Sequence, residues 1–266
     1  MRRFDINGGT LSVYECGAGP AVIFIHGYPL NHTMWSEQFA ALSNNNRLIA
    51  PDLRGFGASS VTDGTVSMEQ MADDLAALLD AMQIRQPVTL CGLSMGGYVA
   101  FQFVRKYRDR VRSLVLCDTR SAADTPEAAA ARLQMASRVL TEGAGPVADA
   151  MLPKLLRPQS AGGPAYERVQ QMILSTDPRG IAAALRGMAA RPDSTSMLAA
   201  IDVRTLVFVG ADDAISPATE MRQLAARIPG AQFEVIPEAG HMAPMENPAA
   251  VNRVLATFLS DELHAR

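Results

Sequence analysis

Residues 87–97 read Pro-Val-Thr-Leu-Cys-Gly-Leu-Ser-Met-Gly-Gly, which contains the pattern Gly-x-Ser-x-Gly. An apolar run precedes the pattern and a helix-length segment follows it, so we predict a strand, a sharp turn and a helix. Gly92 and Gly96 allow a tight turn and close packing, which leaves the hydroxyl of Ser94 exposed at the helix start. We interpret Ser94 as a nucleophile. A plain small-residue turn is the alternative.

Strand-like runs alternate with helix-length segments on both sides of this turn, which predicts an α/β fold with a mostly parallel sheet. The first of these runs alternates with polar residues and follows two glycines, so we expect an antiparallel edge hairpin with residues 3–6. The predicted strands cover residues 10–15, 21–26, 47–51, 87–91, 113–117, 205–210 and 232–236.

Residues 119–200 have a different character. They are rich in alanine, methionine and arginine and are interrupted by many prolines and glycines, without a strand-like run. This spacing of helix breakers permits several short helices. We therefore predict a core domain of residues 1–118 and 201–266, and a helical lid of residues 119–200 over one end of the sheet.

A serine hydroxyl needs a base to take its proton, and the chain has four histidines. His241 follows the last predicted strand, in a loop that returns across the carboxyl edge of the sheet, and is the predicted base. His26 ends a strand and suits a hydrogen bond that organises a loop. His32 is a candidate pocket residue, and His264 is close to the end of the sequence.

The base needs a carboxylate that fixes its tautomer and stabilises the imidazolium. Asp212 and Asp213 follow a predicted strand and emerge at the same sheet edge as the serine and the histidine. We predict that Asp213 is the acid and that Asp212 caps a turn. Asp118, at the end of another strand, is the alternative acid.

Negative charge on a tetrahedral intermediate must be met by donors already in place. The loop after the strand at residues 21–26 is suited to offer the backbone N–H of Tyr28. The second donor would be the N–H of Met95, where the dipole of the following helix adds to the effect. We therefore predict that these two amides form an oxyanion hole.

The substrate pocket is less well defined by the sequence. The lid and nearby loops contain many methionines, whose flexible side chains fill irregular apolar space. We name Trp35, Met151 and Met242 as candidate substrate-binding residues, with core packing as the alternative. Arg120 follows a predicted strand and could bind a substrate carboxylate, with a surface or salt-bridged position as the alternative.

Composition excludes several classes of function. The formal charge of −3 gives no cationic excess for nucleic acid, and no apolar run is long enough to span a bilayer. Cys16, Cys91 and Cys117 are odd in number and widely spaced, so we expect free thiols in a reducing, cytoplasmic compartment. Neither metal-ligand spacing nor a phosphate-binding loop is present, and we expect no metal and no cofactor.

With these pieces in place, the chain resembles the α/β-hydrolase family over nearly its whole length. The order Ser94, Asp213, His241 is the family's order of nucleophile, acid and base. Support comes from the His26-Gly27 loop, the Pro-Asp-Leu-Arg-Gly-Phe-Gly-Ala-Ser turn of residues 51–59, and the Gly-Ala-Asp-Asp run of residues 210–213. The resemblance implies an eight-stranded, mostly parallel sheet with helices on both faces and a helical lid after strand 6.

Within the family the chain is similar to lid-bearing serine esterases and 3-oxoadipate enol-lactonases. We therefore expect a carboxylic ester hydrolase that cleaves small to medium acyl or aryl esters through an acyl-enzyme, acting as a monomer or small homo-oligomer. An enol-lactonase is the main alternative, and a carbon–carbon bond hydrolase, a perhydrolase or a ligand receptor also stays open. Serine at position 94 disfavours the epoxide and halide chemistries, for which the family uses aspartate.

Overall fold

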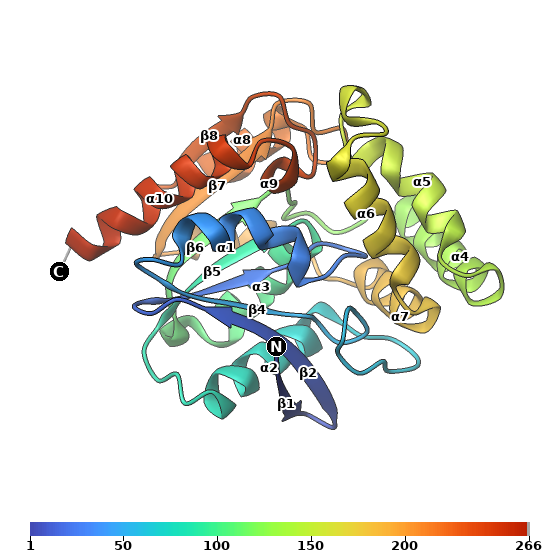
Figure 1. The fold of residues 1–266 in the computed structure, drawn as a ribbon, viewed down its shortest axis with the longest axis horizontal. Helices are drawn as coiled ribbons and strands as arrows, with labels where there is room; N and C mark the ends of the chain where they lie inside the picture. Colours follow the sequence, from blue (N-terminus) through green and yellow to red (C-terminus); the bar gives the residue numbers. More distant parts are fainter. Residues whose placement is uncertain (265–266) are drawn as a thin grey trace.

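The computed structural model describes the backbone of residues 1–264 and the side chains of residues 1–260. Its centre is an eight-stranded sheet with the order β1-β2-β4-β3-β5-β6-β7-β8 (Figure 1). β2 pairs antiparallel with β1 and β4, and the other neighbours are parallel, which confirms the predicted sheet and its edge hairpin. The strands are β1 (Arg2–Ile6), β2 (Gly9–Cys16), β3 (Ala21–Ile25), β4 (Arg47–Pro51), β5 (Val88–Leu93), β6 (Val111–Cys117), β7 (Arg204–Gly210) and β8 (Gln232–Ile236).

Helices cover both faces of the sheet, and the strand order decides which helix lies where. The step from β3 to β4 runs along the sheet in the opposite direction to the steps from β4 to β5 and from β5 to β6. Because crossovers between parallel strands are right-handed, α1 lies on one face, and α2 and α3 lie on the other. α10 packs on α1, and α8 packs on β7 (Figure 1). These helices are α1 (Ser36–Leu42), α2 (Met68–Ala81), α3 (Met95–Lys106), α8 (Ala218–Ala226) and α10 (Pro248–His264), with the short α9 (Ala243–Glu246) before the last.

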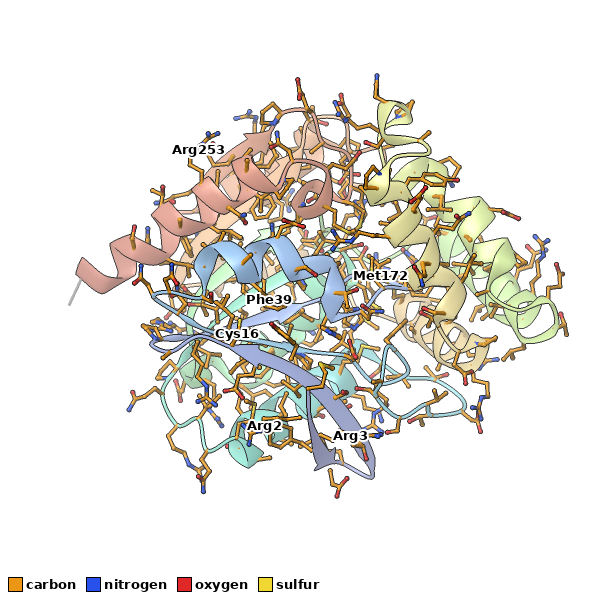
Figure 2. All side chains as sticks on the ribbon, viewed as in Figure 1. Arg2, Arg3, Cys16, Phe39, Met172 and Arg253 are labelled. Carbon is orange, nitrogen blue, oxygen red and sulfur yellow. The ribbon has the colours of Figure 1, made fainter. Side chains whose placement is uncertain are left out.

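The central strands are buried on both faces. Every residue of β5 is buried, as its continuous apolar sequence predicts for a strand between two helix layers. The side chains of Arg2, Arg3 and Arg253, which are labelled in Figure 2, are exposed. Among the described residues, no helix has both the length and the apolarity needed to cross a bilayer.

The sequence predicts several helices after β6, and four α-helices lie between β6 and β7, where they gather at one end of the sheet (Figure 1). Each of them has proline in its first two positions, where the missing N–H costs no hydrogen bond. The prolines predicted as breakers therefore mostly begin helices, and Pro153 lies inside a helix, near its end. The four are α4 (Pro126–Glu142), α5 (Gly145–Leu155), α6 (Pro164–Ser175) and α7 (Pro178–Ala189).

One of these helices packs directly on the backbone of the core. A Cβ atom built on Gly180 of α7 would lie 1.9 Å from the carbonyl oxygen of Gly55, so only glycine permits this approach. α4 in turn packs along α7. We propose that α4–α7 form a lid, residues 119–200, over a core of residues 1–118 and 201–266, with α7 as its fixed base.

Candidate active site

The proposed nucleophile lies at a strained turn between β5 and α3. Ser94 has φ 54° and ψ −115°, a conformation that non-glycine residues rarely adopt. Its N–H donates to Cys117 O at 3.0 Å, and the Thr119 hydroxyl donates to Ser94 O at 2.7 Å. A Cβ atom on Gly96 would lie 2.3 Å from Ile25 O. The end of β6 and the close packing of Gly96 thus hold the turn, and Ser94 remains partly exposed.

Asp213 and His241 form a buried pair at the carboxyl edge of the sheet. His241 Nδ1 lies 2.8 Å from Asp213 Oδ2, and the two side chains are 1% and 0% exposed. A carboxylate accepts hydrogen bonds and does not donate them, so Nδ1 carries the proton and Nε2 keeps a lone pair. This tautomer is the one that a general base opposite a serine requires.

The Asp213 carboxylate is also held by backbone amides. Its Oδ1 accepts the N–H groups of Ile215 at 2.7 Å and Ser216 at 3.0 Å. Burial by itself would raise the pKa of Asp213, but His241 and these two amides outweigh it and the pKa is lowered. Asp213 is therefore ionised at neutral pH.

Asp118, the alternative acid, lies in the same cluster but has other contacts. Its Oδ1 accepts the N–H of Gly210 at 2.8 Å. One oxygen each of Asp118 and Asp213 and one ring nitrogen of His241 lie within 4.8 Å of one another. At that separation two unit charges would repel by at least about 3.5 kcal/mol at an effective dielectric constant of about 20. This spacing would suit a metal ion, but Asp213 and His241 already satisfy each other, so we interpret the cluster as a hydrogen-bond network.

The loop that carries His241 is fixed by a residue that the sequence analysis missed. Glu246, at the end of α9, has a side chain that is 0% exposed. Its Oε2 accepts the N–H of Gly240 at 2.7 Å, and its Oε1 accepts the N–H of Arg157 at 2.9 Å and the hydroxyl of Ser160. The carboxylate thus joins the histidine loop to the segment after α5. An acidic residue in the apolar stretch after His241 was the available signal.

The proposed oxyanion donors lie at the ends of two adjacent strands. Tyr28 follows β3 by three residues, and Met95 is the first residue of α3. Within residues 1–264, the amide hydrogens of Tyr28 and Met95 have no protein acceptor. Both amides are therefore free to bind an oxyanion.

A cavity of about 270 Å³ lies between α4, α5 and the Tyr28 loop. Its walls are mostly apolar, and they include Tyr28 and Met151, two predicted site residues that the structure brings together. Arg132 and Lys154 add two cations, of which Arg132 lies 2.6 Å from the carboxylate of Asp124. The lining residues are Tyr28, Ala128, Ala131, Arg132, Met135, Val147, Ala150, Met151, Lys154 and Leu185.

Three other predicted pocket residues lie elsewhere. Trp35 is 0% exposed and packs on Phe24 with ring centroids 5.0 Å apart, so it belongs to the core. Met242 is also fully buried, and its N–H donates to Leu155 O at 3.0 Å. Arg120 donates to the carbonyl of Ile215 and its Nε lies 3.2 Å from the Glu220 carboxylate. These contacts favour the alternatives of core packing and a salt bridge, and none of the three lines the lid cavity.

His26 and His32 have structural contacts. His26 Nδ1 donates to Gly27 O, and its Nε2 accepts the N–H of Leu53, both at 2.9 Å, so this ring ties two loops together. His32 lies 2.7 Å from the carboxylate of Asp52. The side chain of His264 is outside the described residues.

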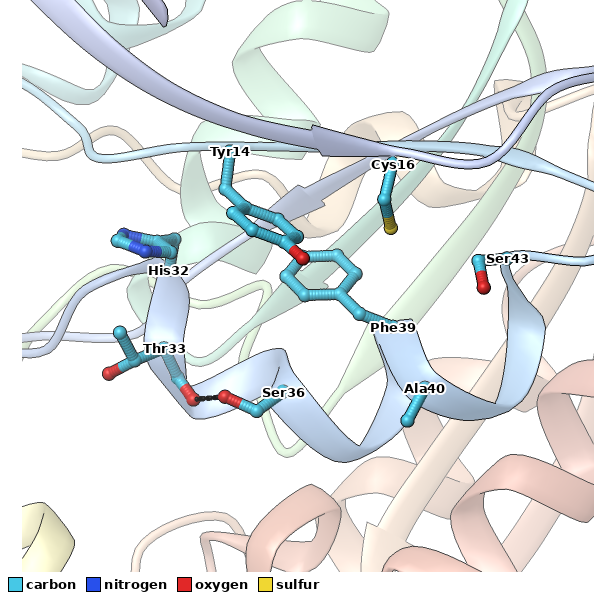
Figure 3. A pocket seen from close by; sticks show the side chains of 8 residues that line it. All are labelled: Tyr14, Cys16, His32, Thr33, Ser36, Phe39, Ala40 and Ser43. Carbon is cyan, nitrogen blue, oxygen red and sulfur yellow. Dashed lines mark hydrogen bonds between the residues drawn. The ribbon is translucent and has the colours of Figure 1, made fainter. Parts of the chain in front are cut away.

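His32 also lines a second cavity, of about 400 Å³, between β2 and α1 (Figure 3). The Tyr14 ring stacks on His32 with centroids 5.8 Å apart, and the Cys16 side chain lies beside Phe39 and Tyr14. This cavity shares no lining residue with the lid cavity. His32 thus lines the cavity between β2 and α1 and not the lid cavity.

Known proteins resemble the chain over nearly its whole length. It is 47% identical to a thermophilic esterase from Thermogutta terrifontis, with a TM-score of 0.97 over 98% of this chain and 99% of that one. The enol-lactonase from Burkholderia xenovorans LB400 is 28% identical, with a TM-score of 0.90 over 97% of this chain and 100% of that one. 3-Oxoadipate enol-lactonase 2 of Acinetobacter baylyi is 29% identical over 242 residues, which are 90% of this chain and 88% of that protein.

The sequence model of the alpha/beta hydrolase fold matches residues 20–248, which include the strands from β3 to β8 and the four α-helices between β6 and β7. The match thus spans most of the chain, including every residue that we assign to the proposed active site. The protein is a hydrolase that belongs to the α/β-hydrolase family.

Proposed function

We propose that the protein is a serine esterase that cleaves carboxylic esters with small to medium acyl or aryl groups. The buried Asp213–His241 pair carries the proposal, because its 2.8 Å contact leaves His241 Nε2 unprotonated at the sheet edge where Ser94 emerges. The 47% identical esterase supports ester hydrolysis as the class of reaction.

The reaction proceeds by two acyl transfers. His241 Nε2 takes the proton of Ser94 as the hydroxyl oxygen attacks the ester carbonyl, and the amides of Tyr28 and Met95 bind the oxyanion. His241 then gives the proton to the leaving alkoxide, which leaves an acyl group on Ser94. A water molecule, deprotonated by the same nitrogen, attacks this acyl-enzyme and releases the acid. Asp213 stabilises the imidazolium in both steps.

The lid cavity is the proposed binding site for the larger apolar part of the ester. Met135 and Met151 line it together with alanine and leucine side chains, and the flexible thioethers can adapt to different groups. A cavity of about 270 Å³ suits a small or medium group rather than a long acyl chain.

An enol-lactonase is the second candidate, and the lid cavity gives it a specific basis. The 28% and 29% identical relatives are named enol-lactonases. Lys154 lines the cavity and has no ion pair within residues 1–260, so it offers a cation for a carboxylate-bearing lactone. Arg120, the candidate from the sequence for that role, forms an ion pair with Glu220.

We also propose a small-molecule substrate, a monomeric or small homo-oligomeric state and a cytoplasmic location. The location rests on the odd number and wide spacing of the cysteines in the sequence.

Hydrolysis of p-nitrophenyl esters from acetate to decanoate tests the proposed function. Turnover that disappears in Ser94→Ala supports a serine esterase, and the best chain length measures the acyl pocket. A parent protein that hydrolyses no ester in the series would contradict the proposal. Lys154→Met separates the two candidates, since it should weaken turnover of a carboxylate-bearing lactone by about 10-fold and spare uncharged esters.

A further inference from the structure

Asp118 is a buried carboxyl group that the proposed reaction does not use. Its residue is 0% exposed and follows β6, and its backbone has φ 45°, in the left-handed region that aspartate enters only occasionally. Oδ1 accepts the N–H of Gly210, whereas Oδ2 has no hydrogen-bond partner in the described part of the chain. A buried carboxylate oxygen without a donor is costly.

The charged groups around Asp118 are mainly acidic. The loop after β7 contributes Asp213, the loop after β8 contributes His241, and α9 contributes Glu246. Arg157 lies 3.8 Å from both Glu246 and Asp212, so its charge is shared between those two carboxylates. Asp118 has no ion pair with any residue whose side chain is described. Burial, followed by the charge of Asp213, raises the pKa of Asp118 well above its ordinary value.

Asp213 has room for one more donor. Its Oδ1 accepts two backbone N–H groups, and its Oδ2 accepts one proton, from His241. A carboxylate offers about four acceptor positions, so one remains on Oδ2. One carboxyl oxygen of Asp118 lies within 4.8 Å of one of Asp213, and the two side chains interact as hydrogen-bond partners. A proton on Oδ2 of Asp118, donated to Asp213, would therefore satisfy the orphaned oxygen of Asp118.

We propose that Asp118 is a protonated carboxylic acid that donates a hydrogen bond to the Asp213 carboxylate and so positions the acid of the triad. The proposal rests on the proposed function, since it takes Asp213 and His241 as acid and base. The neighbours of Asp118 have a matching role, because Cys117 and Thr119 hold Ser94. The three residues 117–119, where β6 ends and the next loop begins, thus align the nucleophile with its acid.

Infrared spectroscopy tests the protonation directly. At pH 7 the parent protein should show the carbonyl stretch of a protonated carboxyl group, which shifts in D2O and is lost in Asp118→Asn. Asp52→Asn is the matched control, because Asp52 is also buried but is ionised at pH 7. Burial by itself would raise the pKa of Asp52, but hydrogen bonds from His32 and Ala58 outweigh burial and the pKa is lowered. The control should keep the band. A parent protein without the band, or a band that survives in Asp118→Asn, would overturn the proposal.

Kinetics test the positioning role. Asp118→Asn keeps a neutral donor, so kcat should fall by only about 3-fold, whereas Asp118→Leu removes a hydrogen bond to a charged group and should lower kcat by about 10- to 100-fold. The midpoint of the acid limb of kcat/KM should move by less than about 0.3 pH unit in Asp118→Asn, because no charge is lost.

If Asp118 were ionised, its replacement by asparagine would remove a negative charge near His241 and lower this midpoint by about one unit or more. That shift, or equal losses of kcat in both variants, would refute the positioning role. The infrared measurement needs no substrate. A parent protein that shows the band but hydrolyses no ester would keep Asp118 protonated and refute only the proposed function.

Discussion

Glu246→Gln should destabilise the protein and slow catalysis, although Glu246 contacts no reacting atom. Its carboxylate is fully buried and accepts three hydrogen bonds, from the amides of Gly240 and Arg157 and from the Ser160 hydroxyl. The Oε1 atom of a glutamine side chain can still accept the hydrogen bonds from the Arg157 amide and the Ser160 hydroxyl. Its NH2 group then faces the N–H of Gly240, so one charge-assisted bond is lost and two donors oppose each other.

The loss can be sized from these contacts. A hydrogen bond to a charged group contributes about 1.5–3 kcal/mol, and a buried donor left without a partner costs a similar amount. We therefore expect the free energy of unfolding to fall by about 2–3 kcal/mol. Gly240 directly precedes His241, and a displacement of the base on the order of 1 Å can cost about 100-fold in rate. We expect kcat to fall at least about 10-fold.

Urea unfolding at pH 7 and ester hydrolysis measure the two effects. Glu238→Gln is the matched control, because Glu238 lies in the same loop but is exposed. A surface substitution of this kind should change the free energy of unfolding by less than about 0.5 kcal/mol. If Glu246→Gln behaves like the control in both assays, Glu246 does not fix the histidine loop.

Three further predictions follow from single residues. Asp213→Asn should lower kcat by about 10³- to 10⁴-fold, because the amide donates toward Nδ1 and forces the imidazole proton onto Nε2; a loss below about 10-fold in steady-state hydrolysis would remove Asp213 from the triad. Burial lowers the pKa of His26 from 6.5 to about 4, so as the pH falls the unfolded chain binds the extra proton before the folded chain does. The contribution of this group to the free energy of unfolding, about 3 kcal/mol, is therefore present above pH 6.5 and is lost as the pH falls to about 4. Urea unfolding at pH 7 and pH 4.5 should show a weaker pH dependence for His26→Asn than for the parent protein, and equal dependences would contradict the lowered pKa of His26. Gly96→Ala should destabilise by about 3 kcal/mol, because the new Cβ meets backbone at 2.3 Å, whereas Gly145→Ala, with no atom within 4 Å, should be nearly neutral in thermal unfolding.

The sheet could be predicted closely from the sequence, because buried parallel strands are continuous apolar runs between helices. β8 matches its prediction, and β7 begins one residue earlier than predicted. β5 extends two residues further than expected, to Leu93. A glycine in a sequence usually indicates the end of a strand, but Gly92 lies within β5. Residue 92 is a glycine because the backbone of Gly96 passes where a Cβ atom would lie.

The part of the candidate site that lies at the carboxyl edge of the sheet could be predicted from the sequence. Asp213 and His241 meet because both follow parallel strands that end at that edge. Contacts made by loops could not be predicted in this way. Glu246 binds the amide of Arg157, 89 residues away in the sequence, and Arg120 pairs with Glu220. Neither pairing leaves a periodic signal, because each depends on how two irregular segments pack together.

The reaction of the protein with an alkyl fluorophosphonate tests the central claim, that Ser94 is a nucleophile activated by His241. Intact-protein mass spectrometry and peptide mapping should find one phosphonyl group per chain, on Ser94, formed with loss of fluoride. Ser94→Ala should take up none, and His241→Ala should react more slowly by orders of magnitude. A protein that gains no adduct, or gains it on another residue while Ser94→Ala still hydrolyses esters, would contradict the account.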